Sequence, residues 1–377
     1  MVEPARPVVE GSGPGLLGRR APWQGAGLAV TGATWRGAGW RGEDGGVPSL
    51  RRETSAPLAW LVALCWSVVG ALWVVSAFHL AHREPWNIMV GFIAVTPWIY
   101  MLAWATAAVG LLDRRYALAG LSLALVALQV WWVAPDFDPF SHLVKPRAGQ
   151  PVLRILDVNV SQDNFDLGPF ASEIRAYRPG VVAIEEITKA GYASLTATGA
   201  MKAYREHSLV YVPGGGSDGM ALWSLYPLSD LHLWYAYGHP EIRAWLHLPG
   251  GVRLRLDVVH TNAPYGSGEP GPWAAQMEAI RRELSREPRP LVVVGDLNAS
   301  WYDWHFQSIL HLGLRDAAVE AGKGWEMTFP ANQLPVWPYV RIDHVLYSSG
   351  VGLVGYGVVH APGSAHRGLV ASVAVGE

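Results

Sequence analysis

Residues that could bind a metal ion or transfer a proton follow a strongly apolar segment in the second half of the chain. The segment is 292–295 (Val-Val-Val-Gly), and Asp296-Leu297-Asn298 comes directly after it. A β-branched run between Pro290 and a glycine predicts a buried strand. Side chains two apart on extended backbone point the same way, so Asp296 and Asn298 would face one pocket, able to hold a hard cation or a phosphate. An Asx-rich turn that closes a core strand explains this stretch alone equally well.

Other polar residues lie at the ends of further predicted strands. Taken singly, a Glu at a strand end is usually solvated, and a His beside apolar strands is usually structural. The residues in question are Asn159, Glu185, Glu186, His260, Asp343, His344 and His366. Six other histidines are interpreted as structural: His232, His239, His247, His305, His311 and His360.

Strands alternate with helices from residue 151 onward, which is typical of an α/β domain with mixed sheets. The expected strands cover residues 152–160, 181–184, 220–224, 244–247, 252–260, 292–295, 342–347 and 369–375. The expected helices cover residues 167–177, 272–286 and 304–312.

Composition excludes some classes of site. Cys65 is the only cysteine, so an intramolecular disulfide and a thiolate metal cluster are both excluded. Residues 151–377 contain 17 Lys and Arg against 22 Asp and Glu, a net charge of −5. This balance is not the basic footprint of a nucleic-acid-binding domain.

Three apolar segments without Asp, Glu, Lys or Arg precede this domain, at residues 58–81, 88–112 and 116–134. Each has about the 20 residues needed to cross a bilayer. Three buried core helices are the alternative, and the short polar links between the segments disfavour it. Arg51, Arg52, Arg114 and Arg115 lie on one side of the predicted spans, so the amino terminus is expected in the cytoplasm.

These segments divide the chain into four parts. We expect a disordered cytoplasmic tail at 1–57, three transmembrane helices at 58–134, a short linker at 135–150 and the α/β domain at 151–377. Three crossings place the α/β domain outside the cell, and the short linker keeps it near the membrane surface. Lys145 and Arg147, which follow the third span, argue weakly for the opposite orientation.

The order of the polar clusters resembles the endonuclease/exonuclease/phosphatase family. The resemblance covers residues 151–375 and is strongest at 179–186 (Pro-Gly-Val-Val-Ala-Ile-Glu-Glu), 295–299 (Gly-Asp-Leu-Asn-Ala) and 342–345 (Ile-Asp-His-Val). It implies a DNase I-like four-layer α/β sandwich, here preceded by three transmembrane helices. With those helices, the whole chain resembles the VanJ-type teicoplanin-resistance membrane proteins of actinomycetes.

The resemblance also implies roles for four of the candidate residues, which concern the metal ion, the attacking water and the phosphate. Asn159 and Glu186 would meet the metal ion, Asp296 would orient or deprotonate the attacking water, and Asn298 would help to hold the phosphate. Ligands that are all oxygen favour Mg²⁺, or Mn²⁺, over zinc.

Three further residues receive roles from the same resemblance. His260 would donate to the phosphate or the leaving oxygen. His366 would polarise the phosphoryl oxygen or act as an acid or base, with Asp343 fixing its tautomer. The family usually has Ser-Asp-His where this chain has Ser364-Ala365-His366, so one carboxylate near the metal is missing.

The resulting expectation is a membrane-anchored, divalent-metal-dependent phosphoesterase acting outside the cell. Its substrate would be a lipid-linked phosphate or diphosphate of cell-wall synthesis, with a role in glycopeptide resistance. The alternatives are an outer-surface nuclease, disfavoured by the acidic domain, and a binding or sensor module, favoured by Ala365. The aromatic residues Trp301, Tyr302 and Trp304 are expected at the rim of the pocket, because they follow Asp296 closely.

Overall fold

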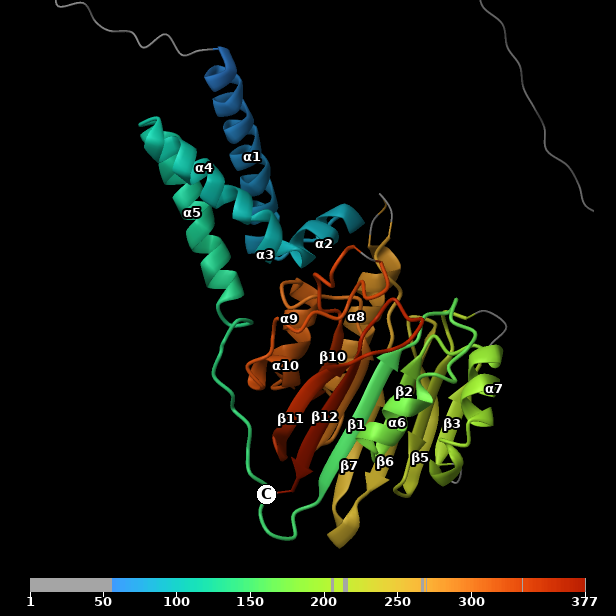
Figure 1. Ribbon diagram of the computed structural model, residues 1–377. Coiled ribbons are helices and arrows are strands. Elements are labelled where there is room, and N and C mark those ends of the chain that lie inside the picture. Colours follow the sequence, from blue (N-terminus) through green and yellow to red (C-terminus); the bar gives the residue numbers. More distant parts are fainter. Residues whose placement is uncertain are drawn as a thin grey trace, which may run out of the picture. The chain divides into compact units, whose positions relative to one another are not determined.

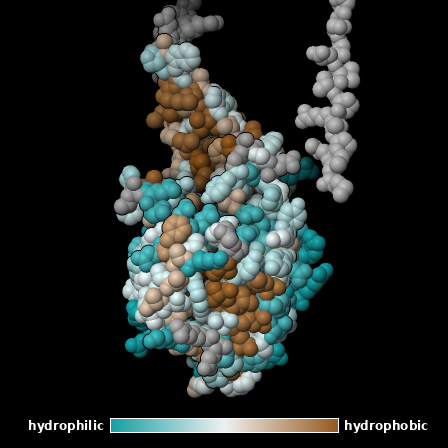
Figure 2. Space-filling model, turned by 90° about the vertical axis from the view of Figure 1, so that its right-hand side faces the viewer, coloured by the Kyte–Doolittle hydropathy of each residue, from teal (hydrophilic) through white to brown (hydrophobic). Residues whose placement is uncertain are grey.

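The computed structural model describes residues 56–204, 207–212, 216–265, 268, 270–333 and 335–376. The tail expected at 1–57 lies outside this range except for its last two residues, which begin the first helix. The first described part is helical, and apolar residues gather on its visible surface (Figure 2). Its helices are α1 (Ala56–Leu80), α2 (Asn87–Ala94), α3 (Thr96–Ile99), α4 (Met101–Leu112) and α5 (Tyr116–Val133).

Two of the three expected membrane spans are single helices. By length and composition, α1 with 25 residues and α5 with 18 can cross a membrane. The middle segment is bent by 68° between α2 and the α3–α4 pair. The bend has a local cause, because Pro97 has no N–H for the carbonyl of Ile93, which accepts from Thr96 Oγ1 instead (2.7 Å). This segment is therefore a broken span or a re-entrant loop, and the expectation of three transmembrane helices is supported for two.

The second part contains two six-stranded mixed sheets (Figure 1). Their strand orders are β11-β12-β1-β2-β4-β3 and β5-β6-β7-β8-β10-β9. The strands are β1 (Val152–Asn159), β2 (Val181–Glu185), β3 (Ser208–Tyr211), β4 (Met220–Ser224), β5 (Leu228–Ala236), β6 (His239–His247), β7 (Arg253–Val258), β8 (Leu291–Asp296), β9 (Arg315–Asp316), β10 (Asp343–Tyr347), β11 (Val351–Val359) and β12 (Gly368–Val375). All eight expected strands form.

Helices cover the outer faces of both sheets. Apolar residues such as Leu153 and Val292 pack between the sheets, while Ile174 and Ile280 pack between a sheet and its helices. The four layers agree with the expected α/β sandwich. The first sheet is covered by α6 (Ala171–Tyr177) and α7 (Lys189–Ala197), and the second by α8 (Gly271–Leu284) and α9 (Trp304–Leu310). The short elements are α10 (Ala317–Glu320) and the 3₁₀ turns Lys202–Tyr204 and Pro249–Gly251.

The strand directions collect several strand ends at one end of the sandwich. The pairs β1/β2 and β7/β8 are parallel, so their carboxyl ends lie together. Strand β10 runs antiparallel to β8, and its first residue, Asp343, pairs with Asp296. This end of the sandwich is the one that faces α2 and α3 (Figure 1). The fold therefore gathers the predicted polar residues beside the helical part.

The segment expected as a linker is bound to the domain. The backbone N–H of Val144 donates to the carbonyl of Leu353 (2.7 Å). Asp136, which follows α5, is buried and forms an ion pair of 2.6 Å with Arg341. The other side of the Arg341 guanidinium pairs with Asp316, also at 2.6 Å. The end of the last apolar helix is thus fixed to the strand that carries Asp343.

Gly295 allows the close approach of two strand ends. Its φ is 135°, and a Cβ at this position would collide with the carbonyl oxygen of Val259. We expect Gly295→Ala to lower the free energy of unfolding by about 3 kcal/mol, since both the backbone and its neighbour must shift. Thermal unfolding measures this, with Gly355→Ala as the control, because a Cβ at Gly355 meets no atom within 4 Å. Equal melting temperatures for the two variants would contradict it.

Candidate active site

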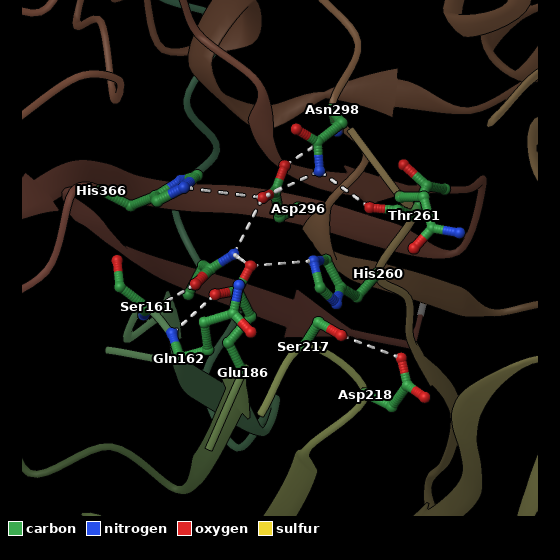
Figure 3. Close-up of polar contacts among 12 residues, drawn as sticks. Ser161, Gln162, Glu186, Ser217, Asp218, His260, Thr261, Asp296, Asn298 and His366 are labelled. Carbon is green, nitrogen blue, oxygen red and sulfur yellow. Dashed lines mark hydrogen bonds and ion pairs between the residues drawn. The ribbon is translucent and has the colours of Figure 1, made fainter. Parts of the chain in front are cut away.

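Polar side chains from several strand ends surround one pocket of about 620 Å³. Five of the seven predicted site residues line it: Glu186, His260, Asp296, Asn298 and His366 (Figure 3). The other two, Asn159 and Asp343, are buried behind them and hydrogen-bonded to them. The structure therefore brings all seven together, although they come from residues 159 to 366 of the chain.

Asp296 is held by a dense set of donors. Its Oδ1 accepts from the backbone N–H of Asn298 (2.8 Å), and its Oδ2 accepts from Nδ2 of Asn159 (3.0 Å). The amide of Asn298 also donates to the carbonyl of Thr261 (2.8 Å), which fixes its orientation. Burial, and then the nearby Asp343 carboxylate, raise the pKa of Asp296 to about 7. A carboxylate with this pKa can accept a proton near neutral pH.

His366 lies between two carboxylates. Its Nδ1 is 3.1 Å from each oxygen of Asp343, and its Nε2 is 3.8 Å from Oδ2 of Asp296. Burial by itself lowers the pKa of His366, but Asp343 and Asp296 outweigh burial and raise it to about 9. The imidazole is therefore charged at neutral pH, with Nδ1 donating to Asp343. This arrangement agrees with the orientation predicted for the pair.

We expect Asp343→Asn to reduce kcat for phosphoester hydrolysis by about 10²–10³-fold, because the imidazolium of His366 loses its closest negative charge. The same loss lowers the pKa of His366, so the alkaline limb of the pH–rate profile should move to lower pH. Asp163→Asn is a matched control, since Asp163 lines the same pocket and is exposed. A fall in kcat with an unmoved alkaline limb would contradict this account of His366.

Glu186 lines another part of the same pocket. Its Oε1 accepts from Nδ2 of Asn159 (3.1 Å), and its Oε2 accepts from the backbone N–H of Gln162 (2.7 Å). The neighbouring Glu185 points the other way and is fully buried near Asp157. Burial raises the pKa of both Glu185 and Asp157 well above the usual value. Only Glu186 of the two adjacent glutamates therefore belongs to the pocket.

The donor set fits a divalent cation. Ligand atoms of Asp296, Asp343 and His366 all lie within 4.8 Å of one another, and because the His366 imidazole is charged at neutral pH, the two carboxylates are the ligands that this group offers there. The carboxylate of Glu186, predicted with Asn159 as a metal ligand, is linked to this group through the Asn159 amide. Carboxylate oxygens predominate, a ligand type that suits Mg²⁺ or Mn²⁺.

His260 lies between the pocket and a buried acidic residue. Its backbone N–H donates to Oε2 of Glu241 (2.7 Å), and its Nε2 is 3.6 Å from Oε1 of Glu186. Burial, and then the charges of His239 and His366, hold the pKa of His260 well below its usual value. A neutral imidazole still has one N–H to donate to a phosphate oxygen. His239, interpreted from the sequence as structural, packs edge-to-face on His260 at 5.1 Å.

Three pocket residues adopt left-handed backbone conformations: Ser161 (φ 64°), Glu186 (φ 55°) and Asn298 (φ 46°). Such conformations are strained for residues with a side chain and are often found at functional sites. Ser161 was not predicted as a site residue. Its Oγ accepts from the backbone N–H of Ala365 (2.9 Å), which joins the first strand end to the segment that carries His366. Contacts between residues this far apart leave no signal in the sequence.

The aromatic residues after β8 do not lie at the rim of this pocket, contrary to the prediction. Within the described residues, the pocket lining includes none of Trp301, Tyr302 and Trp304. They contact the helical part instead, because the chain turns away from the pocket after Asn298. The hydroxyl of Tyr302 donates to Asp136 (2.9 Å), and the backbone N–H of Trp304 donates to Glu84 (2.8 Å).

Comparison with solved structures finds several that are similar to part of this chain. An endonuclease/exonuclease/phosphatase from Beutenbergia cavernae DSM 12333 is 20% identical over 60% of this chain and 72% of its own, with a TM-score of 0.46. A functionally unknown conserved protein from Enterococcus faecalis V583 is 17% identical over 60% and 100%, with a TM-score of 0.49. The human Nocturnin catalytic domain with bound sulfate is 18% identical over 62% and 100%, with a TM-score of 0.47. No curated protein matches the chain.

Fold and site together are of a phosphoesterase-like type, with a cluster of side chains that could bind a metal ion. Residues 158–366 match the model of the Endonuclease/Exonuclease/phosphatase family. The chain belongs to this family, whose members are generally hydrolases of phosphoester bonds and typically use divalent metal ions.

Proposed function

We propose that this chain is a membrane-anchored phosphoesterase that acts outside the cell on a lipid-linked phosphate or diphosphate of cell-wall synthesis. Its activity would contribute to glycopeptide resistance by changing the supply of that lipid. The observation that carries the proposal is the pocket that contains Asp296, His366 and Glu186, in a chain that also has two helices of membrane-spanning length.

The residues of the pocket suit hydrolysis by an activated water. Asp296 accepts a proton from the water while the water oxygen attacks phosphorus. The bond between phosphorus and the leaving oxygen then breaks. The imidazolium of His366 stabilises negative charge on the phosphoryl oxygens, and Asn298 and His260 hold the phosphate by hydrogen bonds. Glu186 and Asn159 would hold a divalent cation, which supplies Lewis-acid stabilisation when bound.

The charge of the pocket favours a small phosphate group over a nucleic acid. No Lys or Arg is among the described residues that line it. A nuclease groove needs cations along the phosphate backbone, whereas a single phosphate or diphosphate group needs only the metal ion and the imidazolium. The orientation proposed from the arginines places Arg114 and Arg115, which join α4 to α5, in the cytoplasm and the domain outside.

The test uses the full chain in vesicles of phosphatidylethanolamine and phosphatidylglycerol, supplied with a polyprenyl diphosphate. We expect Mg²⁺- or Mn²⁺-dependent phosphate release that stops with a chelator and is lost in Asp296→Asn. Cleavage of single-stranded DNA without phosphate release would support the surface nuclease instead. Absence of both activities in a folded protein, with the metal varied, would support a binding module.

A substitution at Ala365 distinguishes an active enzyme from a degenerate member of the family that has lost a metal ligand. Ala365 lines the pocket at the position where the family usually has Asp. An enzyme adapted to Ala365 should gain little from Ala365→Asp in the same assay. A large gain in phosphate release would instead indicate that the natural chain has lost a ligand and works poorly as an enzyme.

A further inference from the structure

The mouth of the pocket has apolar residues on both sides. Tyr265 lines the pocket and is 78% exposed. On another side, Phe329 and Gln333 line the pocket, and the loop formed by residues 335–339 (Pro-Val-Trp-Pro-Tyr) follows directly. Within that loop Trp337 is 76% exposed. Two large aromatic side chains thus stand exposed beside a polar pocket.

Both sides of the mouth are hydrogen-bonded to the bent helical segment. At the start of α2, the backbone N–H of Asn87 donates to the carbonyl of Gly268 (3.0 Å), three residues after Tyr265. In α3, the indole N–H of Trp98 donates to the carbonyl of Tyr339 (2.7 Å). The segment that connects α1 to α4 therefore contacts the pocket mouth at two separate places.

Helix α2, which contacts the pocket mouth through Asn87, also has exposed apolar side chains. Ile88 and Phe92, which are four residues apart and so share one face of the helix, are 57% and 42% exposed. Trp86 and Trp98 flank the helix and are also exposed. Indole rings with a polar N–H are typical of the boundary between lipid headgroups and acyl chains.

The backbone of the 335–339 loop is suited to an environment poor in water. Pro335 and Pro338 have no N–H group. The N–H of Val336 donates to the carbonyl of Gln333 (2.6 Å), and the N–H of Tyr339 donates to the carbonyl of Phe329 (3.0 Å). Four of the five residues therefore present no unpaired N–H, the group that is most costly to place among lipids.

We propose that the 335–339 loop, Tyr265 and the exposed face of α2 form one surface that lies in the headgroup region of the leaflet from which α1 and α5 emerge. The partner of this surface is the lipid bilayer itself, and the pocket then opens directly among lipid headgroups. The proposal rests on the membrane anchoring in the proposed function and adds the residues that set the height of the pocket. It also restricts the substrate class to amphiphiles whose phosphate lies at the membrane surface.

The depth of single residues in vesicles tests this surface. Replacing Cys65, the only cysteine, by Ala allows one environment-sensitive fluorophore to be attached to Trp337→Cys. Val152→Cys is the matched control, because Val152 is 41% exposed at the amino end of β1, opposite the pocket. In full-chain vesicles of phosphatidylethanolamine and phosphatidylglycerol, brominated lipids should quench the label at 337 and aqueous iodide should quench the label at 152.

The outcomes separate this inference from the proposed function. If alkaline carbonate extracts the chain from the vesicles, membrane anchoring itself fails. If the chain resists extraction but iodide quenches both labels equally, the inference is overturned while the proposed function stands. A second variant, Trp337→Asp, should reduce phosphate release from vesicle-bound polyprenyl diphosphate at least tenfold relative to a soluble short-chain analogue. An unchanged ratio would also overturn the inference.

Discussion

Replacing Asp296 by Asn is expected to reduce kcat for phosphate release by about 10³-fold or more, because the pocket loses the carboxylate best placed to accept a proton from water. The amide has nearly the same shape, and its single oxygen can still accept from the backbone N–H of Asn298, while its NH₂ group replaces the oxygen that accepts from Asn159. Activity should therefore fall without a change in fold. Phosphate release from a polyprenyl diphosphate, measured on the full chain in vesicles, gives the rate.

Stability provides the control for this variant. The folded-state pKa of Asp296, about 7, lies above its usual value, so folding favours the protonated form. Stability is therefore lost as the pH rises from about 4 through about 7, and above that range the buried charge weakens the fold. At pH 8 Asp296→Asn removes this charge and should leave the melting temperature equal or higher. If Asp296→Asn instead melts at a lower temperature at pH 8, its lost activity would be explained by destabilisation of the fold.

Replacing Arg341 by Met is expected to lower the free energy of unfolding by about 3–5 kcal/mol, because it leaves two buried carboxylates without their shared cation. Asp136 and Asp316 each lie 2.6 Å from the guanidinium, and all three side chains are buried. Burial raises the pKa of Asp136 even with Arg341 present, so the ionised carboxylate is disfavoured further when the cation is lost. Thermal unfolding of the full chain in detergent measures the effect.

A matched surface variant and a rescue variant test the cause. Arg286→Met removes an exposed ion pair with Glu283 and should change stability by less than about 0.5 kcal/mol. Adding Asp136→Asn to Arg341→Met should restore part of the loss, since it removes one unpaired buried charge. No restoration would show that the Arg341 side chain acts through packing alone. A fragment that begins after residue 136 lacks the same partner and should also be less stable.

The edge strands are the strands that the sequence pattern did not predict. The eight strands expected from the sequence lie inside the sheets, where most of their residues are buried. The four strands that were not expected, β3, β5, β9 and β11, are the two edges of each sheet. In β11, glycines at 352, 355 and 357 interrupt the pattern, and in β9 only two residues pair. Edge strands bury less surface, so their sequences are less constrained.

The candidate site was largely predictable because its residues follow buried strands. Asp296, Asn298 and Glu186 stand directly after apolar runs, and the fold places such strand ends together. The residues that hold them were not predictable. Glu241 accepts from the backbone of His260, and Ser161 holds Ala365, through contacts 19 and 204 residues apart along the chain. A single polar residue in an apolar strand gives no indication of its partner.

The sequence by itself determined the strongly apolar helices and the buried strands and indicated seven candidate site residues, because local hydrophobic pattern and residue chemistry are written in short stretches. Only the tertiary structure decided what those elements meet. It turned the expected linker into a docked segment through Asp136 and Arg341, which are 205 residues apart. It moved Tyr302 and Trp304 from the pocket to the helices, and it joined Asn87 and Trp98 of the middle apolar segment to Gly268 and Tyr339 beside the pocket mouth. Each outcome depends on which groups pair across long separations, and such pairing is set by the packing of the whole chain.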